Sequence, residues 1–345
     1  MCNDDKSDEL KICVIDTPFS LFYYLLIFGI KDEDIFIMSR HIPKEIRDNI
    51  DHIFFPITVV YLYNSLKNII KDIVIFATLP FFILNLRIKL HRKTKGYNVK
   101  AYGHGHLLFA FPLYEYPNSG IIEDGIGNYS ELPEYKEYPP VPKFIFSKFY
   151  GKYIRTIYDG FGTHPNVKEI YLTKGEGYSE KIKDKVIVKK LDDLIDTIDE
   201  DTKNKILKIF NADEIEKMNI KKTDILFLTE PFSEGGEIPL EEEINICREM
   251  ISKYDSKNIV IKPHPREKKD YKKYFPEVRV INGKFPLEIF KLMGIEFKKI
   301  ITVNSSAALN FKDVEVEFYD GKMSNEHVNR QRKQLQKQYQ ELLDN

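Results

Sequence analysis

The chain has few cysteines and lacks the motifs of several common enzyme classes. Its 345 residues include only Cys2, Cys13 and Cys247, which lie far apart and form no CxxC pair. Neither a zinc site nor a disulfide framework is therefore indicated, and a reducing cytoplasm is the expected compartment. The sequence also contains no glycine-rich P-loop, no GxGxxG and no GxSxG. The chain therefore lacks the motifs that are typical of ATPases, dinucleotide oxidoreductases and serine hydrolases.

Long apolar runs and an excess of one charge are also missing. The most apolar stretch, residues 73–86, is interrupted by Pro80 and Asn85 and is shorter than the about 20 residues of a membrane-spanning helix. The polar residues 1–6 do not read as a signal peptide. With 52 basic and 53 acidic residues the net charge is −1, which argues against a nucleic-acid-binding protein.

One segment departs from this charge balance. Residues 87–100 carry basic side chains and no acidic one. Such a run is either a solvated helix end and loop or a contact for acidic lipid or an anionic acceptor. Both interpretations remain open, and the second would place the protein at the inner face of a membrane.

The chain is long enough for two α/β domains of roughly 150 residues each. Short apolar runs alternate with segments of helical length, which favours mostly parallel sheets. We predict domains at residues 1–155 and 156–320, followed by a C-terminal helix at 321–345 that packs back on the body or on a partner subunit. The predicted strands lie near residues 11–15, 35–38, 53–55, 73–76, 169–172, 225–228, 258–261, 279–281, 300–303 and 315–318.

The most informative residue is His264, which stands between two prolines directly after a predicted strand. Ligands bind at the carboxyl ends of strands in open α/β sheets, and Pro265 helps to fix the backbone there. Lys262 and Arg266 flank the histidine with positive charge. The pattern favours a histidine that assists the departure of a phosphate over a purely structural one.

Further candidates follow other predicted strands. Ser305 and Ser306 offer hydroxyls and N–H groups at a helix start, which suits phosphate, although an ordinary N-cap would look the same. Glu288, at another helix entry, could accept hydrogen bonds from a ribose diol or simply favour the first helical turn. Asp124, between Glu123 and Gly125, is a candidate general base, and Glu234 is a second one.

These residues form an ordered set that resembles the bacterial sialyltransferases of glycosyltransferase family 52. The set reads Glu123-Asp124-Gly125, Lys262-Pro263-His264-Pro265, Phe285-Pro286-Leu287-Glu288 and Ser305-Ser306. The openings at residues 16–21 and 228–234 resemble that family as well, so the likeness covers nearly the whole chain. The resemblance implies a GT-B fold, with two Rossmann-like domains facing a central cleft.

The resemblance also implies an inverting transfer of sialic acid from CMP-sialic acid to a galactose-terminated glycan of a surface lipooligosaccharide or polysaccharide. By the same likeness His264 assists departure of CMP, Ser305 and Ser306 hold its phosphate, and Glu288 holds its ribose. No cofactor and no metal are expected. Gly235 stands where many relatives are expected to carry aspartate, so either Asp124 or a carboxylate of that loop, such as Glu234, would be the base.

Two alternatives remain. A phosphotransferase of the CDP-glycerol type could use a similar histidine-proline turn and later serines around a cytidine nucleotide. A non-catalytic nucleotide-binding or glycan-binding protein is the other.

Overall fold

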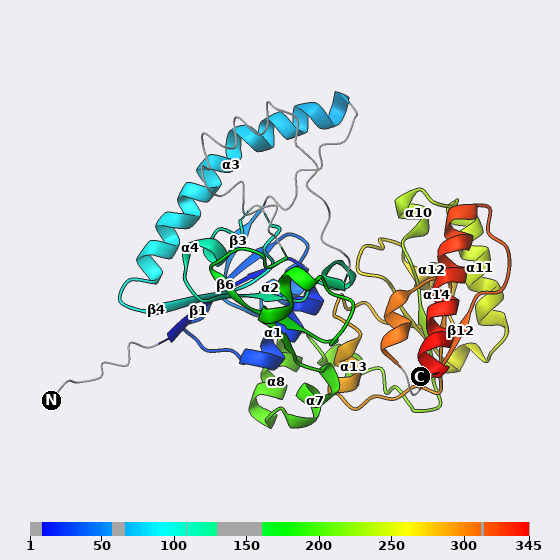
Figure 1. The fold of residues 1–345 in the computed structure, drawn as a ribbon. Helices are drawn as coiled ribbons and strands as arrows, with labels where there is room; N and C mark the ends of the chain where they lie inside the picture. The colour runs from blue at the N-terminus through cyan, green and yellow to red at the C-terminus, as the bar shows by residue number, and fades with distance from the viewer. Residues whose placement is uncertain (1–8, 57–65, 108, 130–160, 312–313, 345) are drawn as a thin grey trace. The chain divides into compact units, whose positions relative to one another are not determined.

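The chain forms two compact units, Met1–Ile209 and Phe210–Asn345, each built on a parallel sheet with helices between its strands (Figure 1). The computed structural model describes residues 9–56, 66–107, 109–129, 161–311 and 314–344. The alternation of strands and helices confirms the predicted α/β class with two Rossmann-like sheets.

The first sheet has seven parallel strands in the order β3-β2-β1-β4-β5-β6-β7. β1 lies in the interior of the sheet and pairs with both β2 and β4. The strands are β1 Glu9–Ile15, β2 Ile35–Ser39, β3 His52–Phe55, β4 Asn98–Gly103, β5 Ser119–Ile122, β6 Val167–Leu172 and β7 Val186–Val188.

Helices α1 and α3 contribute to the core of this unit. Tyr24 of α1 makes an edge-on ring contact with Phe36 of β2, whereas Leu79 and Leu86 of α3 share a cluster with Ile12 of β1. The helices are α1 Pro18–Phe28, α2 Lys44–Arg47, α3 Leu66–Lys93, α4 Pro112–Glu115, α7 Leu191–Thr197 and α8 Glu200–Ile209, with short 3-10 turns η1 Ile126–Tyr129 and η3 Glu180–Lys185.

Helix α3 corrects one prediction. Residues 73–76, expected as a strand, belong to this helix, which continues through Pro80. A short apolar run cannot by itself distinguish a strand from a buried helix, and the buried Leu79, Ile83, Leu86 and Leu90 recur at helical spacing. Among the helices of the described segments, none is both long and apolar enough to cross a membrane.

The division between the units differs from the predicted one. Residue 155, the predicted boundary, lies outside the described residues. After it, β6 pairs with β5 of the first sheet, and β7 pairs with β6. The first unit therefore continues to Ile209. The sequence predicted β6 as a strand, at residues 169–172, but it predicted neither β7 nor the sheet that the two strands join.

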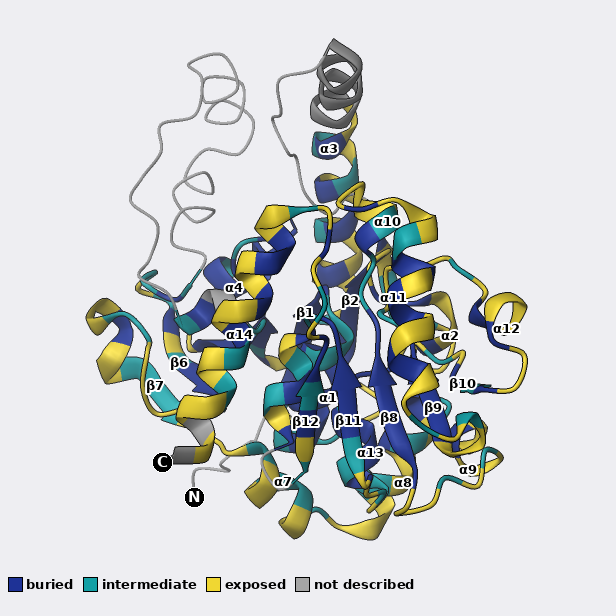
Figure 2. Cartoon of the chain, turned by 90° about the vertical axis from the view of Figure 1, so that its right-hand side faces the viewer, coloured by how far each residue is buried: buried dark blue, intermediate teal, exposed yellow. Residues whose placement is uncertain are grey.

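The second sheet has five parallel strands in the order β10-β9-β8-β11-β12, and its central strands are buried (Figure 2). The strands are β8 Ile225–Leu228, β9 Ile259–Lys262, β10 Arg279–Val280, β11 Lys299–Thr302 and β12 Glu315–Phe318. The helices are α9 Asp213–Glu216, α10 Phe232–Gly235, α11 Leu240–Ser252, α12 Tyr271–Tyr274, α13 Glu288–Leu292 and α14 Glu326–Asp344, with 3-10 turns η4 Ser256–Asn258 and η5 Ser306–Asn310.

The C-terminal helix α14 packs on the second unit. Val328 is fully buried in the core of that unit. The hydroxyl of Tyr339 accepts a hydrogen bond from the N–H of Val316 at 3.0 Å, and Arg332 donates to the carbonyl of Gly321 at 2.7 Å. The helix therefore packs back on the body of its own chain, which is one of the two predicted arrangements.

Candidate active site

Three neighbouring strands of the first sheet end in side chains that suit acid–base chemistry. Asp16 follows β1, His104 follows β4, and Asp124 follows β5 after one intervening residue. β4 lies between β1 and β5. The carboxyl ends of parallel strands are where such sheets bind ligands, so Asp124 lies at the edge where a functional group is expected.

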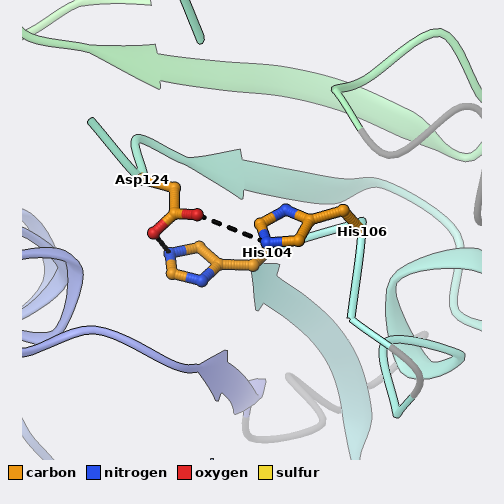
Figure 3. Close-up of side chains that lie close together, drawn as sticks. All are labelled: His104, His106 and Asp124. Atoms are coloured by element: carbon orange, nitrogen blue, oxygen red, sulfur yellow. Dashed lines mark ion pairs between the residues drawn. The ribbon is translucent and has the colours of Figure 1, made fainter. Parts of the chain in front are cut away.

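Asp124 faces two histidines that come from the end of β4 (Figure 3). Its Oδ1 lies 3.5 Å from Nε2 of His104, and its Oδ2 lies 3.3 Å from Nε2 of His106. The two imidazole rings stack with their centroids 5.6 Å apart. One carboxylate thus has an imidazole nitrogen near each of its oxygens.

Burial sets the protonation of this cluster. It raises the pKa of Asp124 to about 6, and the charge of nearby Asp16 acts in the same direction. Burial also lowers the pKa of His104 to about 4 and lowers that of His106. At pH 7 both imidazoles are therefore neutral, and Asp124 is an ionised carboxylate that accepts a proton more readily than an ordinary aspartate.

The same three residues could hold a divalent cation. One ligand atom from each of His104, His106 and Asp124 lies within 4.8 Å of the others, and imidazole nitrogens with a carboxylate are ligands that Zn²⁺ accepts. His104 is 1% exposed, and among the described residues neither of its ring nitrogens has a hydrogen-bond partner, the 3.5 Å approach of Nε2 to Asp124 being too loose to count as one.

Glu123 and Gly125, the neighbours of Asp124, have different surroundings. The buried Glu123 accepts hydrogen bonds from the hydroxyl of Tyr129 and from the N–H of Thr173, each at 2.6 Å. It thereby ties the end of β5 to the end of β6. Gly125 has a φ of +108° with open space beside it, so the chain can turn there directly after the carboxylate.

Sequence reasoning missed two further polar residues at this edge. Asp16 accepts hydrogen bonds from the Ser39 hydroxyl, and its Oδ2 lies 3.0 Å from Nδ1 of His41. His104 was also missed as a site residue. Their position in the sequence could have identified Asp16 and His104, because each lies directly after the carboxyl end of a strand.

In the second unit the central strand β8 lies between β9 and β11. Leu228 of β8 aligns with Lys262 of β9 and with Thr302 of β11. His264 lies two residues beyond this register on one side, and Ser305 lies three residues beyond it on the other. The sheet therefore brings the predicted phosphate-assisting histidine and the predicted phosphate-binding serine to one edge.

His264 is held as a neutral hydrogen-bond donor. Its Nδ1 accepts the backbone N–H of Arg266 at 3.1 Å, so the neutral ring carries its hydrogen on Nε2. Burial, together with the charges of Arg266 and Lys262, lowers the pKa of His264 to about 4. Nε2–H can therefore donate to a phosphate oxygen without the ring first taking up a proton.

The buried Glu267 holds the backbone of the loop that carries His264. Its Oε2 accepts the N–H of His264 and the hydroxyl of Thr229, both at 2.6 Å. Its Oε1 accepts the hydroxyl of Tyr271 at 2.6 Å. One buried carboxylate thus joins the ends of β8 and β9 to α12.

Lys262 and Pro265 complete this loop. Lys262 is buried, and burial lowers its pKa to about 8. Its Nζ donates to the carbonyl of Pro263 at 3.3 Å and lies 4.8 Å from the ring centroid of Phe285. Pro265 is exposed. A buried ammonium beside the histidine adds positive potential at this edge.

The remaining predicted nucleotide-binding residues are connected through η5. The N–H of Ser305 donates to the hydroxyl of Thr302 at 3.0 Å, while Ser306 is exposed. Glu288 is buried at the start of α13, and its Oε1 accepts the side-chain amide of Asn310 at 2.9 Å. Glu288 and the two serines are thus linked by one short segment.

Glu234 lies in a network of charges. It forms an ion pair with Lys269 at 2.6 Å and accepts the N–H of Lys268 at 2.9 Å. Burial alone would raise its pKa, but these two hydrogen bonds outweigh it and lower the pKa. Lys269 also contacts Glu243 and Glu267. Of the two predicted candidate bases, Asp124 is therefore the stronger base.

A carboxyl group that sequence reasoning passed over, Glu230, lies between the histidine and serine positions. It follows β8 and hydrogen bonds with the side chain of Ser305. Burial raises its pKa to about 7. The signal in the sequence was its place after the central strand, but its protonation depends on neighbours that only the fold supplies.

Comparisons with known proteins agree with this architecture. The chain is 30% identical over 314 residues to an uncharacterized protein of Haemophilus influenzae, covering 90% of this chain and 94% of that protein. Its fold is similar to the GT-B domain of a Photobacterium damselae sialyltransferase, with a TM-score of 0.56, 12% identity and 97% coverage of both chains.

A second solved structure has the same GT-B architecture. It is an α/β-galactoside α2,3-sialyltransferase of Photobacterium phosphoreum, with a TM-score of 0.53, 13% identity and coverage of 96% of this chain and 95% of the other. These likenesses confirm the predicted fold type. The model of glycosyltransferase family 52 matches residues 58–323, and the chain therefore belongs to glycosyltransferase family 52.

Proposed function

We propose that this protein transfers sialic acid from CMP-sialic acid to a galactose-terminated glycan of a surface lipooligosaccharide or polysaccharide, with inversion and without a metal. Family membership supports glycosyl transfer, and the fold is one used by two sialyltransferases. The observation that carries the proposal is the edge of the second sheet. There a neutral His264 whose Nδ1 accepts a backbone N–H, a buried Lys262 and Ser305 lie at the ends of adjoining strands.

In this proposal Asp124 takes the proton of the acceptor hydroxyl, whose oxygen attacks the anomeric carbon. The bond from that carbon to the phosphate oxygen breaks, and its electron pair leaves with CMP. His264 donates a hydrogen bond to the phosphate, and Ser305 and Ser306 bind it through hydroxyl and N–H groups. Glu288 binds the ribose diol, with its carboxylate oriented by Asn310.

The test is a transfer assay with the purified protein, CMP-sialic acid and lactose, with and without EDTA. We expect release of CMP together with a sialylated product, at a rate that EDTA does not change. CDP-glycerol serves as the competing donor, because the alternative phosphotransferase would use it. Turnover of CDP-glycerol without turnover of CMP-sialic acid would replace the proposal with that alternative.

The outer face of α3 supports a further part of this proposal, contact with an anionic membrane. Phe81, Leu84 and Ile88 are 67%, 58% and 45% exposed, and their spacing places them on one side of the helix. The same face continues to the exposed Arg92, and the exposed Lys95 follows in the turn after the helix. An exposed apolar stripe that ends in basic residues suits the surface of an anionic bilayer, where a lipid-linked acceptor would be found.

Sedimentation with phosphatidylglycerol vesicles tests this contact. We expect Phe81→Ser/Leu84→Ser/Ile88→Ser to lose vesicle binding, while Leu240→Ser, which changes an exposed apolar residue of the second unit, keeps it. Phosphatidylcholine vesicles should bind the parent protein more weakly. If this face joined two copies instead, the triple variant would dissociate a dimer in ultracentrifugation and vesicle binding would be absent throughout.

A further inference from the structure

The described residues contain two groups of three side chains whose ligand atoms lie close enough together to hold one metal ion. They are His104, His106 and Asp124 in the first unit and Glu234, Glu243 and Glu267 in the second. The ammonium of Lys269 lies 2.6, 2.9 and 3.1 Å from an oxygen of each of the three glutamates. A side chain of the protein itself therefore already supplies the cation of the second group.

The first group has a different charge environment. In the described segments Asp124 forms its ion pairs with the two histidines, and no lysine or arginine joins them. Asp16 acts electrostatically on both His104 and Asp124, and it is another carboxylate. Partly buried negative charge without a matching cation is unfavourable. A divalent cation at this place would offset that cost.

The distances within the first group suit a tetrahedral ion (Figure 3). Nε2 of His106 lies 3.3 Å from one oxygen of Asp124, and Nε2 of His104 lies 3.5 Å from the other. Both separations are longer than an ordinary N–H···O hydrogen bond. Two ligand atoms on one tetrahedral Zn²⁺ lie about 3.3–3.5 Å apart, given bonds of about 2.0–2.1 Å. The three side chains are therefore spaced as zinc ligands are.

His104 gives an independent reason to expect a ligand. Its buried ring faces Asp124, and neither ring nitrogen forms a hydrogen bond with any described residue. A buried polar atom without a partner costs free energy, which an ion bound at Nε2 would recover. The side chains of His106 and Asp124 are 31% and 24% exposed, so an ion can reach the group from solvent.

The donor set selects the metal and sets how tightly it is held. Two imidazoles and a carboxylate suit Zn²⁺, whereas Mg²⁺ and Ca²⁺ prefer oxygen ligands alone. A zinc-bound histidine normally donates its second ring N–H to a neighbour, and lack of that partner costs about 10–100-fold in affinity. Nδ1 of His104 has no such partner among the described residues. We therefore expect reversible binding, weaker than that of a structural zinc site.

We propose that His104, His106 and Asp124 form a reversible Zn²⁺ site that switches this protein off. The two Nε2 atoms and a carboxylate oxygen donate lone pairs to the ion, and water takes the fourth position. The binding of Zn²⁺ stands on the geometry. Its inhibitory effect rests on the proposed function, because a carboxylate that is bound to Zn²⁺ cannot accept the proton of the acceptor hydroxyl.

Co²⁺ titration of protein dialysed against EDTA tests the site without any transfer reaction. Tetrahedral Co²⁺ absorbs visible light far more strongly than the octahedral hydrated ion, so its spectrum reports the coordination. We expect one such Co²⁺ per chain, displaced by Zn²⁺, both in the parent and in His91→Ala, which changes an exposed histidine of α3.

His104→Phe and His106→Gln each remove one ligand, and we expect both to lose the intense spectrum. Loss of a ligand should weaken binding more than loss of an outer partner does, so by at least about 10-fold. His106 is partly exposed, so its variant gives the answer even if the change at the buried His104 prevents folding. A parent without the intense spectrum, or equal spectra in parent and variants, would overturn the site.

Inhibition kinetics test the consequence for transfer. Zn²⁺ should compete with lactose, because both need Asp124, and it should leave the affinity for CMP in calorimetry unchanged. Mg²⁺ should have no effect. Zn²⁺ that weakens CMP binding as strongly as it inhibits would place the ion in the second unit and overturn the proposal. Co²⁺ binding in a parent that does not use CMP-sialic acid would instead refute the proposed function and leave the metal site standing.

Discussion

The polar cluster around His104 in the first unit and the one around His264 in the second are alike in that burial shifts their pKa values. They differ in the hydrogen bonds of their histidines. In both, an imidazole has a pKa near 4 and a carboxyl group has a raised one. Nδ1 of His264 accepts a backbone N–H, whereas within the described part of the chain both ring nitrogens of His104 lack a hydrogen-bond partner. The imidazole of His264 is therefore fixed in one orientation, while the imidazole of His104 can still form hydrogen bonds with a ligand.

This difference matches the two kinds of chemistry proposed. A departing phosphate needs donors in fixed positions, because preorganised donors stabilise charge without reorganising. An acceptor hydroxyl needs a base that is ionised and still reachable. The following variants separate these roles, beginning with the largest expected effect.

Asp124→Asn should abolish the base and lower kcat by about 10³-fold, because the amide cannot accept the acceptor's proton. The matched variant Glu234→Gln removes the other candidate carboxylate, which Lys269 already neutralises. It should stay within a few-fold of the wild type in the same transfer assay. A larger loss in Glu234→Gln than in Asp124→Asn would move the base to the second unit.

His264→Ala should lower kcat by about 10²-fold, because the donor to the departing phosphate is lost. His264→Gln restores an N–H near the position of Nε2 and should recover part of that loss. Steady-state kinetics at saturating donor measure both. Equal activities of the two variants would contradict a role through Nε2–H.

Added Zn²⁺ should inhibit transfer by binding Asp124 together with His104 and His106, and EDTA should reverse the inhibition. His106→Ala removes one ligand and should weaken the inhibition while the protein stays folded. Zinc titration followed by calorimetry checks binding directly. Inhibition that persists unchanged in His106→Ala would place the ion elsewhere.

The smallest effect is expected on stability. His104→Phe removes two buried nitrogens that form no hydrogen bond with any described residue and should raise the free energy of unfolding by about 1–2 kcal/mol. His264→Phe breaks an existing hydrogen bond and should give no such gain. Urea denaturation of both variants measures the difference, and a gain in both would remove the contrast between the clusters.

Much of the architecture could be predicted from local patterns. Residues 258–261 and 300–303 were predicted as strands from their apolar composition, and His264 and Ser305 follow them as expected. Such local patterns do not predict which distant strands pair with one another. The predicted strand β6 pairs with β5 of the first sheet, and β7, which was not predicted, pairs with β6. Residues 73–76, predicted as a strand, are helical within α3.

The places of His264 and Asp124 at the carboxyl ends of strands could be predicted from residue type and position, and their roles in the reaction stay a proposal. The site was not predictable where chemistry depends on burial. Glu230 is one of many glutamates in the sequence, and it is burial in the fold, with the charge of Glu267 acting in the same direction, that raises its pKa. His104 likewise becomes distinctive only because its nitrogens are enclosed.

The contacts of Glu267 have a consequence for how the family can diversify. This carboxylate orients the His264 backbone from the protein interior, whereas Pro265 and Arg266 on the same loop are exposed. Substitutions on the exposed side can alter which donor or acceptor is preferred without re-aiming the imidazole. The loop thus has a buried side that holds the His264 backbone and an exposed side that is open to substitution, and directed evolution of specificity should begin at Arg266.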